Sequence, residues 1–236
     1  MTRCAGSTTR TAAYSDSVSA PDWTCILFDL DGTIADSAPG ITASLGYMFE
    51  ELGLEVPSAE ELREWVGPPI LDSFRDRAGM TPTQAAQALA IYRDHYLEHG
   101  GTGAPIFEGI PHVLRTIHQS GTPLALATSK PEFPASIILD HGNLTANFRV
   151  ISGSSIDEIR SAKKDVIAEA LTRFRMIGVD TSRPVMVGDR DYDVEGAAAN
   201  GMPSIFVTWG YGKPGEEQGS IAQVGHPREL LPLLLG

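Results

Sequence analysis

Short apolar runs alternate with helix signals along most of this chain, and that alternation restricts the folds open to it. Helix candidates lie at 111–120, 131–141, 163–174 and 191–200. The apolar runs are of strand length and are ILF at 26–28, PLALAT at 123–128, RVIS at 149–152, PVMVG at 184–188 and SIFVTW at 204–209. Strands that alternate with helices predict a parallel sheet with crossover helices. We therefore expect an α/β fold.

The interval from residue 36 to residue 106 breaks this alternation, because it contains helix signatures but no strand candidate. One helix places its apolar residues on a single face, and two further helices begin with a capping box. These features use Ile41, Leu45, Met48, Phe49 and Leu52 in the first helix, Ser58 with Glu61 in the second, and Thr81 with Gln84 in the third. We expect residues 36–106 to form a helical cap, inserted into an α/β core made of residues 22–35 and 107–236.

The segment before this core, residues 1–21, is rich in Ser, Thr and Ala and has no acidic residue before Asp16. A transit peptide shares this bias. An ordinary flexible tail shares it too, and a flexible tail is what we expect.

The charge and the cysteines narrow the classes of function. A net charge of −12 and a pI near 4.8 oppose nonspecific binding to nucleic acid or to an anionic membrane. The two cysteines, Cys4 and Cys25, fit neither a disulfide framework nor a zinc cluster. No apolar run is long enough to cross a bilayer, and the opening segment lacks the apolar core of a signal peptide. We expect a cytoplasmic protein that is a monomer by default.

Two aspartates stand two positions apart in FDLDGT, residues 28–33, where the first apolar run gives way to glycine. Side chains alternate along a strand, so Asp29 and Asp31 point to the same side and their carboxylates crowd each other. Folding does not need two like charges in contact. A cation, a shared proton or a reaction is therefore expected at this turn.

Polar residues also stand at the ends of two other predicted strands. Thr128 and Ser129 close the run at 123–128, and Asp189 and Asp193 follow the run at 184–188. In open parallel sheets, ligands bind at the carboxyl ends of the strands. Hydroxyls can donate hydrogen bonds to an anion, and clustered carboxylates suggest a hard cation such as Mg²⁺. The strand ends therefore predict a metal and an anion bound together.

A positive charge is expected near these acids, and SAKKDVIAEAL supplies two lysines at the start of a helix. The hydrophobic pattern of that helix turns Val166 and Ile167 toward the core. We expect Lys163 to be the inward lysine and Lys164 to be solvated.

In order and spacing, these residues resemble the four-motif signature of the haloacid dehalogenase superfamily. The signature residues are Asp29-Leu30-Asp31-Gly32-Thr33, Thr128, Lys163, and Gly188-Asp189 with Asp193. The match spans the chain after about residue 22. ATSKP at 127–131, the early helical cap and GDRDYD at 188–193 resemble the phosphoglycolate-phosphatase-like branch with its helical C1 cap. The resemblance implies a Rossmann-like core, a mobile cap and Mg²⁺-dependent hydrolysis of a small phosphorylated metabolite.

The resemblance also implies a role for each residue. Asp29 would attack phosphorus and form an aspartyl-phosphate, which splits one hard displacement into two easier ones. Asp31 would protonate the leaving alkoxide and then accept a proton from water, and its backbone carbonyl would ligate the metal. The implied metal set is Asp29, Asp31, Asp189 and Asp193, with Asp193 either in contact with the metal or behind the ligands. The implied phosphate-binding set is Gly32, Thr128, Ser129 and Lys163.

Other functions use the same fold. β-Phosphoglucomutase resembles this chain in core and cap, but its cap carries a histidine early in the first helix, where Ile41 stands here. That departure disfavours a phosphomutase. A haloacid dehalogenase does not need Asp31 as a leaving-group acid. A noncatalytic binding protein would lack a motif residue, and none is missing.

The cap loop EWVGPPILDSFRDR at 64–77 is the expected substrate selector. Arg63, Arg75 or Arg77 could pair with a substrate carboxylate, which would suit phosphoglycolate, but each could equally be a solvated helix charge. Nucleoside monophosphates, small sugar phosphates and phosphorylated intermediates of secondary metabolism remain alternatives.

Overall fold

The sheet is parallel throughout, and its six strands lie in the order β3-β2-β1-β4-β5-β6. The computed structural model describes residues 22–100, 103–155 and 160–236. The strands are β1 Cys25–Phe28, β2 Leu124–Pro131, β3 Val150–Ser154, β4 Pro184–Gly188, β5 Ser204–Val207 and β6 Ala222–Val224. The chain builds outward from β1 to β3 and then continues on the other side of β1 with β4. The boundary between β1 and β4 is therefore the topological switch point, where open α/β sheets bind their ligands.

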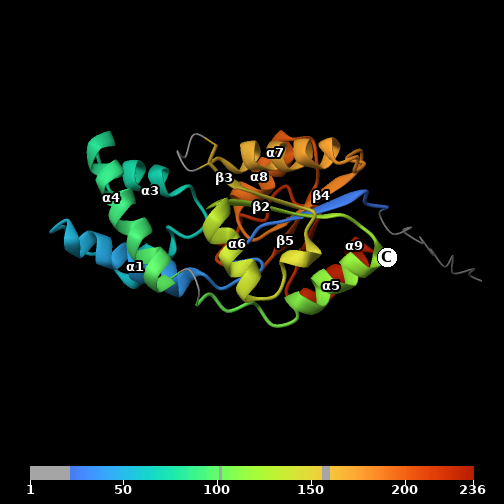
Figure 1. The fold of residues 1–236 in the computed structure, drawn as a ribbon, viewed down its shortest axis with the longest axis horizontal. Coiled ribbons are helices and arrows are strands. Elements are labelled where there is room, and N and C mark those ends of the chain that lie inside the picture. Colours follow the sequence, from blue (N-terminus) through green and yellow to red (C-terminus); the bar gives the residue numbers. More distant parts are fainter. Residues whose placement is uncertain (1–21, 101–102, 156–159) are drawn as a thin grey trace, which may run out of the picture.

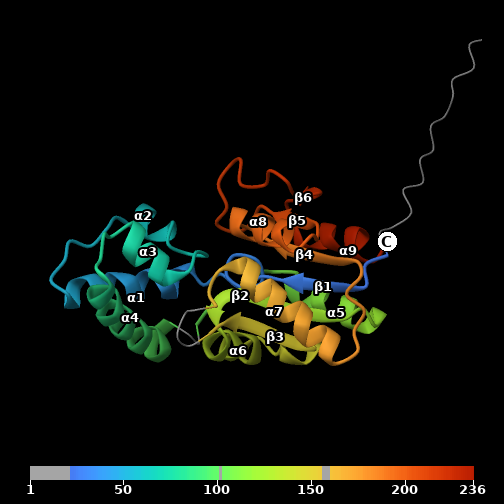
Figure 2. The same cartoon turned by 90° about the horizontal axis from the view of Figure 1, so that it is seen from above.

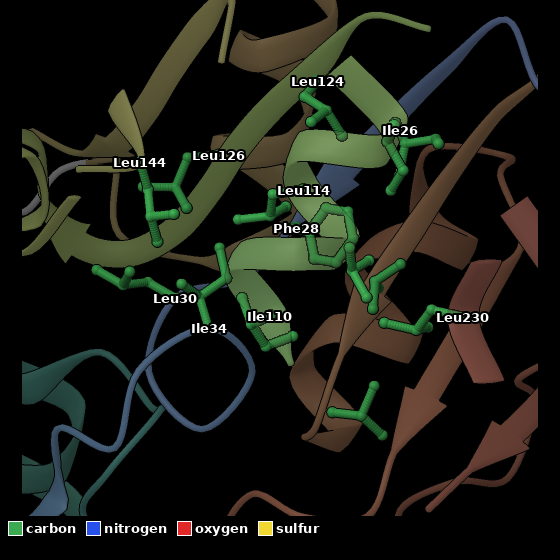
Figure 3. Packing of buried hydrophobic residues seen from close by; sticks show 14 of the residues in the cluster. Ile26, Phe28, Leu30, Ile34, Ile110, Leu114, Leu124, Leu126, Leu144 and Leu230 are labelled. Atoms are coloured by element: carbon green, nitrogen blue, oxygen red, sulfur yellow. The ribbon is translucent and has the colours of Figure 1, made fainter. Parts of the chain in front are cut away.

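Helices cover both faces of the sheet (Figure 1). One face carries α5 Ile110–Ser120, α6 Glu132–His141 and α9 Leu230–Leu234, and the other carries α7 Lys163–Met176 and α8 Asp191–Ala199. Short helical turns, η2 Thr145–Asn147 and η3 Pro227–Glu229, complete the core. Side chains of β1 alternate between the faces: Ile26 and Phe28 join the first cluster, which Figure 3 shows, and Leu27 joins the second. Both faces of β1 are buried, as in a central parallel strand.

Between β1 and α5 the chain forms a separate group of helices beside the sheet (Figure 2). They are α1 Ala38–Glu51, α2 Ala59–Arg63, α3 Ile70–Asp76, α4 Pro82–His95 and the π-helical η1 Tyr96–Gly100. The predicted capping boxes at Ser58 and Thr81 are confirmed, because each side chain accepts a hydrogen bond from the backbone three residues on. These helices enclose a hydrophobic cluster of their own, in which Phe74 contacts the rings of Trp65 and Tyr92. We call this group of helices the cap.

Two adjacent linkers join the cap to the sheet. Ala35 and Ile106 form an isolated antiparallel bridge. On either side of it, the backbone N–H of Asp36 donates to Pro105 at 2.8 Å and that of Phe107 donates to Ile34 at 3.0 Å. The chain therefore leaves and re-enters the core at one place, next to the end of β1. In the described parts of the chain, no helix has both the length and the hydrophobicity needed to cross a lipid bilayer.

The structure confirms the five predicted strands and the four predicted core helices, with differences at their ends. It adds the edge strand β6, the short helix α3 and the final helix α9, which the sequence did not predict. The predicted tail, residues 1–21, lies outside the described residues. The exact limits of the cap at residues 36 and 106 stay a prediction.

Candidate active site

The acidic turn after β1 is held open by a glycine. Gly32 has a φ of +88°, and a Cβ placed there would lie 2.2 Å from Oδ2 of Asp189. Only a residue without a side chain fits both the backbone conformation and this contact. The turn thus lets Asp189, from the end of β4, pack against the backbone that follows Asp29 and Asp31.

Lys163 is the buried cation of the site, as the sequence predicts. Its Nζ lies 2.5 Å from Oδ1 of Asp29 and 2.9 Å from Oδ1 of Asp193, and it donates to the carbonyl of Ala127 at 3.2 Å. It is the first residue of α7 and is 5% exposed, whereas Lys164 is exposed. One lysine therefore bridges residues that follow β1 and β4.

Asp189 is fixed by two hydrogen bonds from other segments. Thr33 Oγ1 donates to its Oδ1 at 3.0 Å, and the backbone N–H of Tyr211 donates to its Oδ2 at 2.7 Å. Asp193 in turn accepts the backbone N–H groups of Asp189 and Arg190 with its Oδ2, each at 3.1 Å. These bonds orient both carboxylates without use of any residue from the cap.

Asp29, Asp189 and Asp193 form a cluster that could hold a metal ion. One carboxylate oxygen from each lies within 4.8 Å of the others, and all three residues are buried. Three buried carboxylates near one lysine match the oxygen ligands that Mg²⁺ prefers. The sequence-based set also contained Asp31 through its backbone carbonyl, and that ligand role stays a prediction; the side chain of Asp31 pairs with Lys130 instead of joining the cluster.

Burial shifts the pKa values of this cluster. It raises the pKa of Asp29 to about 7; Lys163 opposes that rise, while Asp193 and Asp31 add to it. Burial raises the pKa of Asp189 as well, with further contributions from Asp193 and Asp29. Burial lowers the pKa of Lys163, but the attraction of Asp193 and Asp29 is stronger and raises it overall. The lysine is therefore charged, and a further cation beside the cluster would favour the ionised forms of its carboxylates.

Asp31 pairs with a lysine that the sequence-based site did not include. Lys130 Nζ lies 2.9 Å from its Oδ2 in a buried ion pair, and the ammonium also lies 4.8 Å from the centre of the Tyr96 ring. The second oxygen, Oδ1, is buried and has no hydrogen-bond partner among the described residues. Asp31 thus has one oxygen fixed by Lys130 and one available to a ligand.

The end of β2 supplies the predicted hydroxyls. Thr128 is 1% exposed, and its Oγ1 accepts the backbone N–H of Lys130 at 3.2 Å. Ser129 Oγ is buried, and within the described chain it finds no hydrogen-bond partner. Buried polar atoms are nearly always hydrogen-bonded, so Ser129 is a candidate contact for a bound ligand.

A β-bulge explains why the sequence did not reveal Lys130. Ala127 pairs with Ser152, but Pro131 pairs with Ser154, so β2 uses four residue steps where β3 uses two. Such an irregularity re-aims side chains and is common beside active sites. Regular alternation along β2 does not predict where Lys130 points. Its position two residues after Thr128, at a strand end, was the available signal.

A cavity of about 670 Å³ opens between the cap and the carboxyl ends of the strands. Asp31, Ser129 and Lys130 line it from the sheet, and Trp65, Gly67, Pro68 and Ile70 line it from the predicted selector loop. The three arginines proposed for that loop do not line it. Arg75 pairs with Asp72 and Asp76, Arg77 pairs with Glu64, and Arg63 is exposed.

The cap contacts the core loops beside this cavity. Arg190 Nη1 donates to the carbonyl of Val66 at 2.5 Å while its Nε holds Glu216 at 2.8 Å. Tyr211 Oη donates to Asp36 at 2.7 Å and accepts the backbone N–H of Ala38 at 3.0 Å. Arg190 and Tyr211 thus link the loops beside Asp189 to the cap, a role that the sequence did not indicate.

The chain is similar to proteins that are named as a kinase, a nucleotidase and a phosphatase. The chain is 40% identical over 188 residues to tyrosine-protein kinase PtkA of Mycobacterium tuberculosis, a match that covers 80% of this chain but only 63% of PtkA. It is 35% identical to a 5'-nucleotidase of Pseudomonas aeruginosa, covering 81% of this chain and 85% of that protein. It is 32% identical to a phosphoglycolate phosphatase of Pseudomonas putida, covering 88% and 78%.

The fold has close counterparts among solved structures. A predicted phosphatase from Clostridium acetobutylicum superposes with a TM-score of 0.82 at 36% identity, covering 88% of this chain and 96% of the other. The family model described as haloacid dehalogenase-like hydrolase matches residues 26–207, from β1 through β5. The sheet order, the strand-end acids and these matches agree, and the chain belongs to the haloacid dehalogenase-like hydrolase family.

Proposed function

We propose that this protein is a magnesium-dependent phosphomonoester hydrolase that acts on a small phosphorylated metabolite through an aspartyl-phosphate. The observation that carries the proposal is the division of labour between the two aspartates of the acidic turn. Asp29 forms an ion pair with Lys163 beside two further carboxylates, whereas Asp31 forms an ion pair with Lys130 at the wall of the cavity. These positions support attack by Asp29 and exchange of a proton with the leaving group by Asp31.

In the first proposed step, a carboxylate oxygen of Asp29 forms a bond to phosphorus as the bond to the leaving oxygen breaks. Asp31 donates its proton to that oxygen. We assign the transfer to Oδ1 of Asp31, because Oδ2 is held by Lys130 and Oδ1 lacks a partner in the described chain. In the second step Asp31 takes a proton from water, which attacks the phosphoryl group and releases Asp29.

Lys163, Thr128 and Ser129 are proposed to hold the phosphoryl group. Lys163 carries the positive charge, and the strand-end hydroxyls and the backbone beside Gly32 supply hydrogen bonds. Because these groups are already in place and buried, they stabilise developing charge at no cost of reorganisation. Loss of one such contact lowers the rate by about a hundredfold to a thousandfold.

Asp29, Asp189 and Asp193, with the backbone carbonyl of Asp31, are proposed to hold Mg²⁺. The cluster fits a hard divalent cation, because its donors are three buried carboxylates and the one lysine beside them, Lys163, pairs with Asp29 and Asp193. When bound, the metal would supply charge neutralisation between the attacking carboxylate and the phosphoryl oxygens.

Two substrate classes are suggested by the names of relatives: phosphoglycolate and nucleoside 5'-monophosphates. Sugar phosphates and phosphates of secondary metabolism remain alternatives. A phosphomutase is disfavoured because Ile41, at the position of the mutase histidine, lines the cavity and offers no proton-transfer group. We do not extend the kinase activity named for PtkA to this chain, which spans 63% of that protein.

The test is phosphate release from a panel of phosphomonoesters, with Mg²⁺ and with a chelator. We expect turnover only with the metal, and loss of turnover in Asp29→Asn and Asp31→Asn. Asp165→Asn is a matched control, because Asp165 is exposed on α7 two residues beyond Lys163. Rapid quenching with labelled substrate should trap an acyl phosphate on wild type and none on Asp29→Asn. Absence of metal-dependent release across the panel would refute the proposal.

A further inference from the structure

The cavity over Asp31 is larger than a two-carbon leaving group requires. Its volume of about 670 Å³ lies within the range of roughly 300–1,000 Å³ that is typical of sites for drug-sized ligands. Glycolate would fill a small fraction of it and would leave most of its walls in contact with water. The size therefore points to a substrate with a bulkier leaving group.

The walls of the cavity are mainly apolar and aromatic. The cap contributes Ile41, Trp65, Ile70, Tyr92, Tyr96 and Leu97, and the start of α6 contributes Phe133. Phe133 is 67% exposed and Leu97 is 41% exposed, which makes them two of the few large apolar side chains left in solvent. Phe133 belongs to none of the three hydrophobic clusters of the described chain. An aromatic ring that is exposed and unpacked at the mouth of a site is a typical ligand contact.

Three cations line the cavity, namely Arg93, Lys130 and Arg160, and the last two are paired with carboxylates of the protein. Lys130 pairs with Asp31 at 2.9 Å. Arg160 pairs with Glu132 at 3.4 Å, and Glu132 is also held by Arg173 at 2.7 Å. A substrate carboxylate that bound Lys130 or Arg160 would have to displace the carboxylate that each of them already holds. Recognition by burial of apolar surface has no such cost, so the pairing of these two cations favours an uncharged leaving group.

Three buried polar atoms without partners lie at the sheet side of the same cavity. Asp31 Oδ1, Ser129 Oγ and Ser154 Oγ are buried without a hydrogen bond in the described chain, and all three residues line the cavity. Ser154 ends β3 and is 2% exposed. The cavity thus has a polar floor at the strand ends, where the phosphoester would bind, and apolar walls above it.

We infer that the preferred substrate carries an aromatic ring in its leaving group, and that Phe133 is a specificity-determining residue that stacks on this ring. This inference rests on the proposed phosphatase function and deepens it. Phe133 provides the core side of the contact, and the apolar side chains of the cap provide the other side. A nucleobase and a phenyl ring share the required chemistry, and the experiment separates them.

The experiment compares kcat/KM for 2-phenylethyl phosphate and ethyl phosphate, with 2-phosphoglycolate and adenosine 5'-monophosphate as further arms. The two alkyl phosphates are esters of primary alcohols, so their difference reports binding of the ring rather than leaving-group acidity. We expect the phenylethyl ester to be favoured over ethyl phosphate and phosphoglycolate by about tenfold or more. Preference for the nucleotide over the phenylethyl ester would identify a nucleobase as the ring. Equal values for the phenylethyl and ethyl esters, or a preference for phosphoglycolate, would overturn the inference.

The variant Phe133→Ala tests the residue. We expect it to lower the ratio of kcat/KM for the preferred aromatic ester to that for ethyl phosphate by about tenfold, or about 1.4 kcal/mol. Met176→Ala is the control, because Met176 is 81% exposed at the far end of α7 and does not line the cavity. An unchanged ratio in Phe133→Ala, with its melting temperature intact, refutes the role of Phe133. If no panel ester is hydrolysed with Mg²⁺, the proposed function itself has failed, whereas hydrolysis of all esters without preference removes only this inference.

Discussion

Replacement of Lys163 by methionine removes the buried charge at the centre of the site and keeps an unbranched side chain in its place. In the structure the ammonium contacts Asp29 at 2.5 Å and Asp193 at 2.9 Å, and both partners are at most 2% exposed. Methionine fills similar space but offers no charge. The variant therefore leaves Asp29 and Asp193 without their lysine, in a cluster that also contains Asp189.

The expected loss of stability follows from this geometry. Removal of one partner from a buried ion pair costs about 3–5 kcal/mol, because the remaining charge is left without compensation. For a chain of this size each kcal/mol corresponds to about 2–4 °C in Tm, so we expect Lys163→Met to melt roughly 6–20 °C lower than wild type in a chelator. Lys164→Met should change Tm by little, because Lys164 is exposed.

The loss should depend on pH with a definite sign. In wild type, burial raises the pKa of Asp29 to about 7, and Lys163 opposes this rise. Without the lysine that pKa rises further, and the folded state then holds a proton that the unfolded state has released. Stability therefore falls as the pH rises from the unfolded value of about 4 through the folded pKa. Lys163→Met should therefore be less destabilised near pH 5 than near pH 8.

The assay is thermal unfolding of wild type, Lys163→Met and Lys164→Met at about pH 5 and about pH 8, with chelator and with Mg²⁺. The metal should restore part of the lost stability, because it compensates the same carboxylates. Phosphatase activity of Lys163→Met should fall by about a hundredfold or more. Equal melting temperatures for the two variants at pH 8 in chelator would show that the lysine does not compensate the cluster.

Three further perturbations test the supports of the site. Thr33→Val removes the hydroxyl that donates to Asp189 at 3.0 Å. We expect the affinity for Mg²⁺, measured by calorimetry, to fall about 10–100-fold. Thr33→Ser keeps a hydroxyl and should recover most of this affinity. In wild type the pKa of Asp29 is about 7 without metal, so binding of Mg²⁺ should displace a proton from this residue. The apparent Kd for Mg²⁺ should therefore fall as the pH rises toward 7 and level off above it. Calorimetry in two buffers of different ionisation enthalpy measures how many protons are released. Tyr211→Phe removes the hydroxyl that forms hydrogen bonds with Asp36 and Ala38. The free energy of unfolding, measured with urea, should fall by about 1–3 kcal/mol. An unchanged free energy of unfolding would mean that this link between core and cap does not stabilise the protein.

The core fold was predictable because its signals are local and repeated. Strands buried on both faces appear as short apolar runs, and the helices between them end at recognisable caps and glycines. The strand β6 escaped because Ala222–Val224 is only three residues long at the edge of the sheet, too short to show a pattern. The helix α9, Leu230–Leu234, contains Pro232 and lacks a capping signal, so its apolar run did not predict a helix.

The clustering of the strand-end acids was predictable for a geometric reason. In a parallel sheet the carboxyl ends of neighbouring strands meet at one edge, so acids after β1 and β4 had to lie close together. The choice of Lys163 over Lys164 followed from the periodicity of α7, which turns one lysine inward. Neither argument could place Lys130, because the bulge in β2 breaks the alternation on which such reasoning depends.

The predicted end of β3 illustrates a second limit. The apolar pattern ended the strand at Ser152, but the strand continues through Gly153 to Ser154. The glycine is required there, because a Cβ at this position would lie 2.4 Å from the carbonyl of Lys130. A glycine normally indicates the end of a strand, so the pattern missed the serine that lines the cavity. The close approach of two backbone segments depends on the tertiary structure, and the residue pattern of a single strand does not reveal it.

The surplus of negative charge explains why the stability of this site and its proposed chemistry are linked. Asp29 and Asp193 share the buried Lys163, and Asp189 lies in the same cluster. The pKa values of Asp29 and Asp189 are raised because burial penalises their charged forms. This arrangement costs free energy that a bound cation would offset. Three buried acids beside Lys163 fit the proposed reaction, because that reaction needs a metal and an anion at the same place.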